Sequence, residues 1–130
     1  MAAADGYVFL APEYNFAVPA VLKNALDFLA HEADGKPASI ISYSDTAFGG
    51  VIAGHQLQLV LSKLGMLVMP MSLPLVHAET MLNEDGDAVE QSGIAGKLLR
   101  YLPLNLTKLV KYATAIREVR LAPAQEITAG

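Results

Sequence analysis

The chain has 130 residues, a mean hydropathy of +0.37 and a formal net charge of −4 at pH 7. This length suits one domain with a real core, and the acidic balance excludes a basic surface that would collect nucleic-acid phosphates. The absence of cysteine excludes disulfides, thiolate nucleophiles and cysteine-ligated metals. Prolines and charges interrupt every apolar stretch before the ~18–20 residues of a membrane span, so we expect neither a nucleic-acid nor a membrane partner.

The first predicted element in chain order is a strand over residues 7–11. Its apolar run is uninterrupted, which is typical of a strand covered on both faces of a sheet. The residues before it contain no basic region ahead of an apolar one, so we expect no signal peptide and a cytoplasmic location. A helical pattern then begins near Pro19, and Gly35 lies just past its expected end.

The middle of the chain continues the alternation of strands and helices. A second strand is predicted over 38–43, a second helix over 51–64 that Gly65 closes, and a third strand over 67–69. Because Pro70 interrupts this third strand, we expect it near an edge of the sheet. Strands that alternate with helices predict a parallel sheet with right-handed crossovers and helices on both faces.

The last part of the chain has weaker patterns. Residues 72–78 are expected to be irregular, and the acidic segment 83–87 is expected to be an exposed turn. Ser92 could cap a short helix that Pro103 ends. Apolar residues at helical spacing predict a final helix over 104–120.

Several metal and catalytic motifs are tested and excluded. A calcium loop that starts at Asn83 needs glycine at Ala88 and an acid at Ile94, and both are absent. Gly96-Lys97 lacks the Ser or Thr of a phosphate-binding loop, and no glycine-rich dinucleotide fingerprint is present. The three histidines are interpreted as surface or capping residues, so we predict no metal site.

Two loops follow the first two strands, at 12–15 and 44–50. In open parallel sheets, ligands bind beyond the carboxyl ends of the strands. The first loop offers an aromatic ring and an amide, while Gly49 and Gly50 let backbone approach a flat ligand closely. This composition suits a planar heterocycle held by backbone donors, but ordinary connecting turns would have the same spacing.

A specific motif favours the first interpretation. Residues 12–15 read Pro-Glu-Tyr-Asn, and after Pro19 the segment 22–27 reads Leu-Lys-Asn-Ala-Leu-Asp. This combination resembles the signature of the NADPH-dependent FMN reductase family, whose members have a flavodoxin-like fold and include quinone and azo-dye reductases. Ala20 stands where the family usually has glycine. The resemblance covers residues 3–70 and is specific at this motif.

The segment from Tyr43 to Gly50 resembles the second flavin loop of that family, although Asp45, Thr46 and Phe48 stand where small residues and glycine are commoner. By this resemblance FMN is the cofactor, and NADPH or NADH gives a hydride to flavin N5, from which electrons pass to a small-molecule acceptor. Such transfer needs no protein acid or base, so no catalytic residue is predicted. The residues expected to border the isoalloxazine ring are Pro12, Glu13, Tyr14, Asn15, Tyr43, Ser44, Asp45, Gly49 and Gly50.

The resemblance also implies the fold class, an α/β, flavodoxin-like three-layer parallel sheet with strand order 2-1-3-4-5. In the family, a strand, a Ser/Arg-rich phosphate loop, a helix and a second strand precede the strand that residues 7–11 resemble. We therefore expect only the C-terminal part of the fold, strands 3-4-5, as a partial domain over 1–120 with a tail at 121–130. Strand 3 would present an open edge that needs cover.

Two explanations of this partial fold stay open: a piece of a reductase, or a half-domain that assembles with a copy of itself or a partner. The leading function is an FMN-dependent NAD(P)H oxidoreductase. The alternative is a non-catalytic flavodoxin-like remnant that acts as an oligomerisation or interaction module. A third candidate, a flavodoxin-type electron carrier, is disfavoured, because a net charge of −4 gives little electrostatic field for steering redox partners. The resemblance and the 53% apolar content favour a homodimer or homotetramer.

Overall fold

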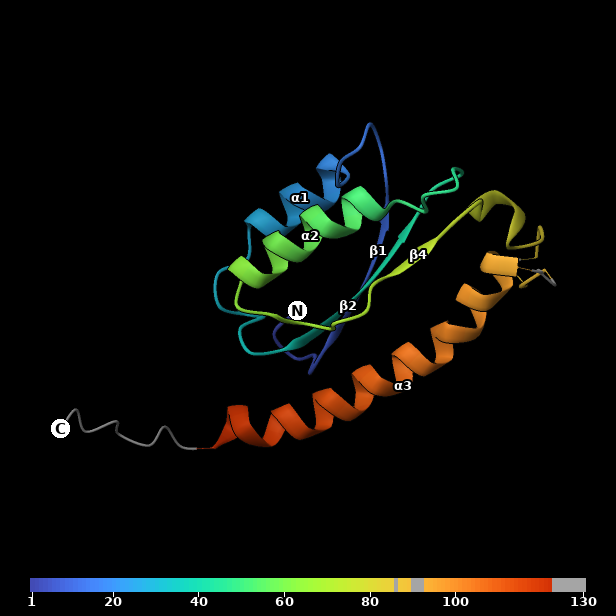
Figure 1. The fold of residues 1–130 in the computed structure, drawn as a ribbon. Coiled ribbons are helices and arrows are strands. Elements are labelled where there is room, and N and C mark those ends of the chain that lie inside the picture. The colour runs from blue at the N-terminus through green and yellow to red at the C-terminus, as the bar shows by residue number, and fades with distance from the viewer. Residues whose placement is uncertain (86, 90–92, 123–130) are drawn as a thin grey trace.

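A parallel sheet separates two helical layers, as Figure 1 shows. The computed structural model describes residues 1–85, 87–89 and 93–122. Within these residues no helix is long and apolar enough to cross a membrane. The elements in chain order are β1 (Tyr7–Pro12), α1 (Ala20–Asp27), β2 (Pro37–Tyr43), α2 (Val51–Lys63), β3 (Leu67–Val68), β4 (Leu73–Leu75), the short 3₁₀ helix η1 (Ala78–Thr80) and α3 (Gly93–Leu121).

The strands lie in the order β1-β2-β3, and β4 pairs with the other end of β2. All pairs are parallel, with Pro37 opposite Leu67 and Tyr43 opposite Leu75. The predicted parallel sheet and the edge position of residues 67–69 are therefore confirmed. The expectation that 72–78 is irregular is wrong, because β4 pairs with β2 beyond the interruption at Pro70. Pro74 lacks an amide donor, and it is tolerated in this short edge strand.

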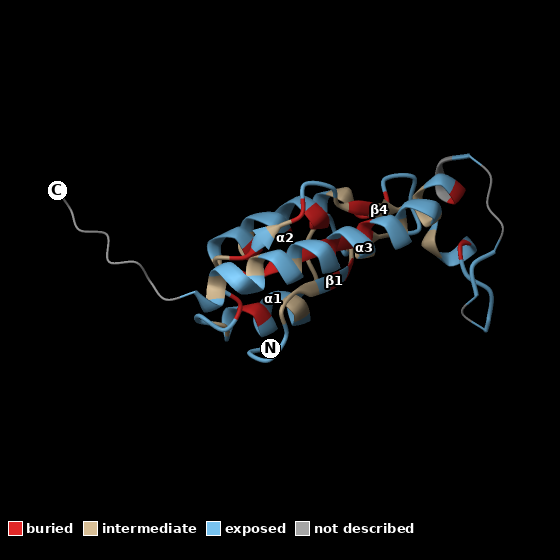
Figure 2. Cartoon of the chain, turned by 90° about the horizontal axis from the view of Figure 1, so that it is seen from below, coloured by how far each residue is buried: buried red, intermediate tan, exposed pale blue. Residues whose placement is uncertain are grey.

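The core lies on the face of the sheet that α1 and α2 cover (Figures 1 and 2). Leu57 and Leu61 of α2 are fully buried and belong to the same cluster as Ile40 of β2. Gly54 lets α2 approach closely, because a Cβ there would lie 3.3 Å from Oγ of Ser42. The helical spacing of apolar residues that predicts a helix over 51–64 thus matches the spacing of the residues that α2 buries.

β1 is buried on one face only. Phe9 and Ala11 point into the core, whereas Val8 and Leu10 are 45% and 57% exposed. The expectation that both faces of residues 7–11 are covered is wrong, because α1 and α2 share one face while α3 packs against β2 and β4. Among the described strands β1 pairs only with β2, so its other edge is open, as the resemblance implies.

The first helix is shorter than predicted. Instead of continuing toward Gly35, α1 ends at Asp27. The amide of Leu29 donates a hydrogen bond to the carbonyl of Leu26 at 3.0 Å, and the amide of Ala30 donates to the carboxylate of Glu32 at 2.7 Å. These two bonds replace the helical ones, and Gly35 takes a positive φ in the turn before β2.

The last helix is longer than predicted. α3 runs through Pro103 without a break and curves along the sheet in Figure 1, so the expected end of a helix at Pro103 is wrong. A proline inside a helix costs ~3 kcal/mol. Just after the proline, Asn105 and Leu109 are buried, and α3 packs against β2 and β4. The cap proposed for Ser92 and the tail after residue 122 lie outside the described residues, while Leu121, assigned to the tail, ends the helix.

The acidic segment 83–87 forms the expected exposed turn in its described residues. The side-chain oxygen of Asn83 accepts the amides of Asp85 and Asp87 at 3.0 and 2.8 Å. This pattern is the local side-chain turn typical of asparagine.

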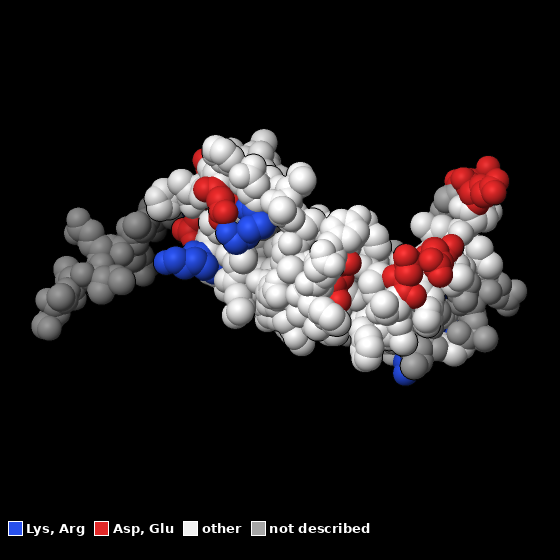
Figure 3. All heavy atoms as spheres, turned by 90° about the horizontal axis from the view of Figure 1, so that it is seen from above, with Lys and Arg blue, Asp and Glu red and all other residues white. Residues whose placement is uncertain are grey.

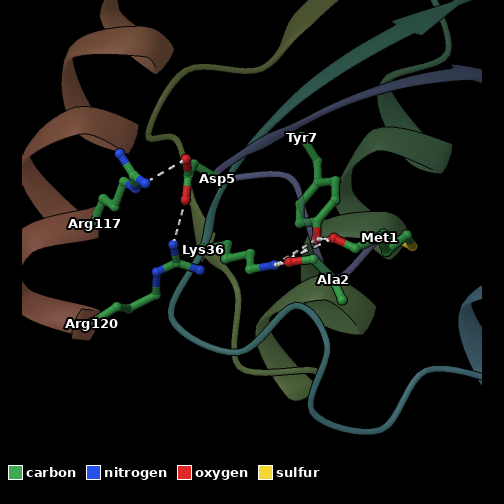
Figure 4. A network of polar contacts seen from close by, with 7 residues as sticks. All are labelled: Met1, Ala2, Asp5, Tyr7, Lys36, Arg117 and Arg120. Carbon is green, nitrogen blue, oxygen red and sulfur yellow. Dashed lines mark hydrogen bonds and ion pairs between the residues drawn. The ribbon is translucent and has the colours of Figure 1, made fainter.

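Polar contacts fasten the N-terminal segment to the end of the sheet opposite the two loops (Figure 4). The guanidinium groups of Arg120 and Arg117 lie 2.6 and 3.4 Å from the carboxylate of Asp5, which joins α3 to the start of β1. Lys36 is buried, and its ammonium group donates to the carbonyls of Met1 and Ala2 and to the hydroxyl of Tyr7.

Candidate functional site

The two predicted loops start side by side at the carboxyl end of the sheet. Pro12 and Tyr43, the last residues of β1 and β2, are register partners. The amide of Glu13 extends this pairing by one bond, 3.0 Å from the carbonyl oxygen of Tyr43. The sequence-based expectation that these loops are neighbours is therefore met in the structure.

The first loop is a tight turn that displays two aromatic rings. Tyr14 and Ala17 exchange backbone hydrogen bonds of 3.2 and 3.0 Å, and Asn15 and Phe16 between them have φ values of 51° and 58°. Asparagine tolerates this left-handed region, but a bulky residue such as phenylalanine is strained there. Tyr14 is 63% and Phe16 is 68% exposed, so the turn presents both rings to the solvent.

Two side chains connect this turn to α2, Glu13 from the loop and Gln56 from the helix. One carboxylate oxygen of Glu13 accepts the amides of Ile52 and Ala53, each at 3.0 Å. From the same helix, Gln56 donates its amide to the carbonyl of Phe16 at 3.0 Å and accepts the amide of Val18 at 3.2 Å. Sequence reasoning missed Gln56, because contacts across about 40 residues leave no local pattern.

The second loop is pinned to the segment around η1. The carbonyls of Thr46 and Ser44 accept the amides of His77 and Ala78, each at 3.2 Å. The hydroxyls of Ser44 and Thr46 lie 2.9 Å apart, and a ring nitrogen of His77 lies 3.1 Å from the carbonyl oxygen of Asp45. This loop therefore has a defined shape.

Gly49 and Gly50 are buried against the backbone of the sheet. Their φ values are 60° and 71°. A Cβ on Gly49 would lie 2.8 Å from the backbone of Pro74, and one on Gly50 would lie 2.8 Å from the carbonyl oxygen of Tyr43. Both positions need glycine so that the loop can turn tightly into α2.

An apolar cavity of about 590 Å³ lies beside the second loop. Its volume is in the range of sites that hold cofactors and other small molecules. Of the predicted site residues only Tyr43 and Asp45 line it, and the other seven lie outside it. Its remaining walls are Leu10, Ile41, Leu75, Ala78, Glu79, Met81, Leu82, Leu99 and Leu102.

No pattern in the sequence predicts most of the residues that line this cavity. Leu75, Met81 and Leu102 come from the C-terminal half, where the family resemblance is only general. Leu10 faces the cavity because α3 leaves its side of β1 uncovered. None of the described side chains that line the cavity is Lys or Arg. On the face of the molecule that Figure 3 draws, the middle of the surface also carries no Lys or Arg.

The described residues contain no group of three His, Asp or Glu side chains that could hold a metal ion. Glu32 lies before β2, at the end of that strand opposite the two loops. Hydrogen bonds from its own backbone and from Ala30 lower the pKa of Glu32.

Curated relatives cover different parts of the chain. It is 50% identical over 70 residues to an NAD(P)H-dependent FMN reductase of Schizosaccharomyces pombe, which covers 54% of this chain and 34% of that protein. It is 33% identical over 127 residues to a 2-hydroxy-1,4-benzoquinone reductase of Burkholderia sp, which covers 93% and 65%. The chain therefore spans about a third to about two thirds of the length of these relatives.

The fold has a solved counterpart in FerB, a flavoenzyme NAD(P)H:(acceptor) oxidoreductase of Paracoccus denitrificans. The TM-score is 0.62 at 24% identity, over 89% of this chain and 63% of that structure. This similarity confirms the flavodoxin-like α/β fold. The model of the NADPH-dependent FMN reductase family matches residues 1–80, which contain both loops, and the chain belongs to that family.

Proposed function

We propose that this chain forms the flavin-ring end of an FMN-dependent NAD(P)H oxidoreductase that reduces a small-molecule acceptor. The observation that carries the proposal is the pairing of the two loops at the carboxyl ends of β1 and β2, next to the apolar cavity. The residues that would border the isoalloxazine ring are those of the loops, 12–15 and 43–50. When bound, FMN would accept a hydride from NADPH or NADH and pass electrons to the acceptor.

The part of FMN that these residues fit is the flat ring. Tyr14 offers an exposed aromatic face, and Tyr43 and Asp45 bring a hydroxyl and a carboxylate to a cavity whose other described walls are apolar except at Glu79. The protein's share in flavin chemistry is to orient the ring, to tune it by hydrogen bonds and to exclude side reactions. The phosphate is not accounted for by these loops, because the described cavity lining carries no cation and Glu13 occupies the amides of Ile52 and Ala53 in the first turn of α2.

The test is the oxidation of NADPH and NADH by the purified protein with FMN and a benzoquinone. The proposal predicts turnover that depends on FMN and saturates with the quinone. Tyr14→Ala is expected to weaken FMN binding about threefold to tenfold, from the loss of a stacking surface worth ~0.5–1.5 kcal/mol. A colourless protein that does not bind added FMN would contradict the proposal.

A second candidate function is an interaction module without catalysis. It is favoured by the open edge of β1 and by the exposed side chains of Val8 and Leu10, since an unpaired apolar strand is a template for another chain. This candidate predicts an oligomer that Leu10→Lys dissociates and that does not oxidise NAD(P)H. FMN-dependent turnover would exclude it. A homodimer or homotetramer and a cytoplasmic location stay predictions from the sequence.

A further inference from the structure

We propose that Glu13 is a positioning residue that couples the two flavin loops into one unit. This inference rests on the proposed function and assigns Glu13 a role other than contact with the ring. Its backbone amide bonds the carbonyl of Tyr43, where the second loop begins. Its carboxylate bonds the amides of Ile52 and Ala53, just after the second loop ends. One residue of the first loop therefore holds both ends of the second.

The carboxylate satisfies a need that α2 cannot meet itself. The first amides of a helix have no partner within the helix. Gly50 precedes α2 and has no side chain to cap it, and the first turn of α2 contains no acidic residue. A carboxylate at this position gains charge-assisted hydrogen bonds and a favourable interaction with the helix dipole. The carboxylate of Glu13 thus caps the N-terminus of α2, although Glu13 is distant from α2 in the sequence.

Gln56 adds a second connection between the first loop and the same helix. It bonds the carbonyl of Phe16 and the amide of Val18 on the two sides of Ala17. Left-handed backbone at Asn15 and Phe16 persists only where the surroundings hold it. With Glu13 before the turn and Gln56 after it, the turn follows α2 as a rigid attachment.

The consequence for the site is that neither loop is expected to move independently. Each loop would present its share of the ring-binding surface in a fixed relation to the other, which lowers the ordering cost of binding a ligand. The same bonds also occupy the α2 N-terminus, so a phosphate cannot use these two amides while Glu13 is in place.

The test compares Glu13→Ala with Glu13→Gln and with a matched control, Glu32→Ala. Glu32 also accepts a backbone amide, that of Ala30, but lies at the opposite end of β2. For Glu13→Ala we expect the Kd for FMN to rise about tenfold and the visible circular dichroism of the bound flavin to change. Glu13→Gln, which keeps one acceptor oxygen, should stay within about threefold, and Glu32→Ala should match wild type. A folded Glu13→Ala protein with wild-type Kd and dichroism would overturn the proposal.

Amide hydrogen exchange separates this inference from the proposed function. If wild type does not bind FMN, the function fails, but the coupling is still measured. Glu13→Ala is then expected to speed exchange about tenfold at Ile52, Ala53 and also Ala17 in the first turn. Unchanged exchange at Ala17 would overturn the coupling. If Glu13→Ala does not fold, Glu13→Gln is expected to speed exchange at Ile52 and Ala53 about threefold, and unchanged exchange there would overturn the proposal.

Discussion

The hydroxyl of Ser39, in the middle of β2, donates a hydrogen bond to the side-chain oxygen of Asn105 on α3, and both residues are buried. The amide of Asn105 donates to the carbonyl of Met71 at 3.0 Å. Met71 lies in the break between β3 and β4. Asn105 therefore joins the middle strand, the interrupted edge and α3 at one point.

Replacing Asn105 is expected to destabilise the fold strongly. Asn105→Ala leaves the buried Ser39 hydroxyl without its partner, and a buried unsatisfied group costs about 1–3 kcal/mol. The variant also loses the bond to the carbonyl of Met71, which is an exposed residue. Urea unfolding measures the loss. The exposed Asn24 on α1 provides the control, because Asn24→Ala should change the free energy of unfolding by less than about 0.5 kcal/mol. Equal stability of the two variants would show that the buried contact has no net value.

Gly50→Ala is expected to cost more than the strain of a left-handed alanine alone. Both Gly50 and Gly93 have positive φ, but a Cβ on Gly50 would collide with the Tyr43 carbonyl, while one on Gly93 would meet nothing within 4 Å. Gly93→Ala should therefore cost only about 1 kcal/mol. Thermal unfolding of both variants tests this, and a Gly50→Ala protein as stable as Gly93→Ala would refute the collision.

The pairing of Asp5 with Arg117 and Arg120 should contribute modestly and in a salt-dependent way. Asp5 is partly exposed, so Asp5→Asn is expected to lower the free energy of unfolding by no more than about 1 kcal/mol. The difference should shrink at 1 M salt, where the Debye length is about 3 Å. Asp27→Asn, which removes the exposed pair with Lys23, is the control and should have a smaller effect. A loss that does not depend on salt would point to packing instead.

We expect the free energy of unfolding to fall slightly in acid because of Glu32. Its folded pKa is lowered from the usual glutamate value by hydrogen bonds to its own backbone and that of Ala30. The unfolded chain therefore binds a proton first as pH falls, so the contribution of Glu32 is present above the unfolded pKa and is lost as pH falls through the folded one. A carboxyl titration by NMR measures this pKa directly, and a value at or above that of a free glutamate would contradict the bonds.

Much of the fold is predictable from the sequence, because local patterns coincide with burial there. In the helix over 51–64, Leu57 and Leu61 of the predicted apolar stripe are fully buried, and the strand over 38–43 is buried throughout except at Tyr43. The errors arise where distant contacts decide. Pro74 is compatible with β4 because β2 supplies the pairing, and α3 continues through Pro103 while it packs against β2 and β4.

The site shows the same division. The turn-forming residues and the positions of the loops at neighbouring strand ends could be predicted from composition and from the topology rule for parallel sheets. The bonds of Glu13 to residues 39 and 40 positions later in the chain could not, since no local pattern encodes them. The sequence predicts Gly49 and Gly50 as site residues because glycine lets backbone approach a ligand closely. The structure shows that glycine at these positions also permits close packing against β4 and β2.

The most direct test of the central claim is the mapping of amide chemical shifts in the labelled protein during titration with FMN. The account predicts saturable shifts concentrated in two segments, 13–17 and 43–50, with smaller shifts at the cavity walls of β4 and α3. Shifts confined to other parts of the chain, or a spectrum that does not change at saturating FMN, would contradict the claim that these two loops border the flavin ring.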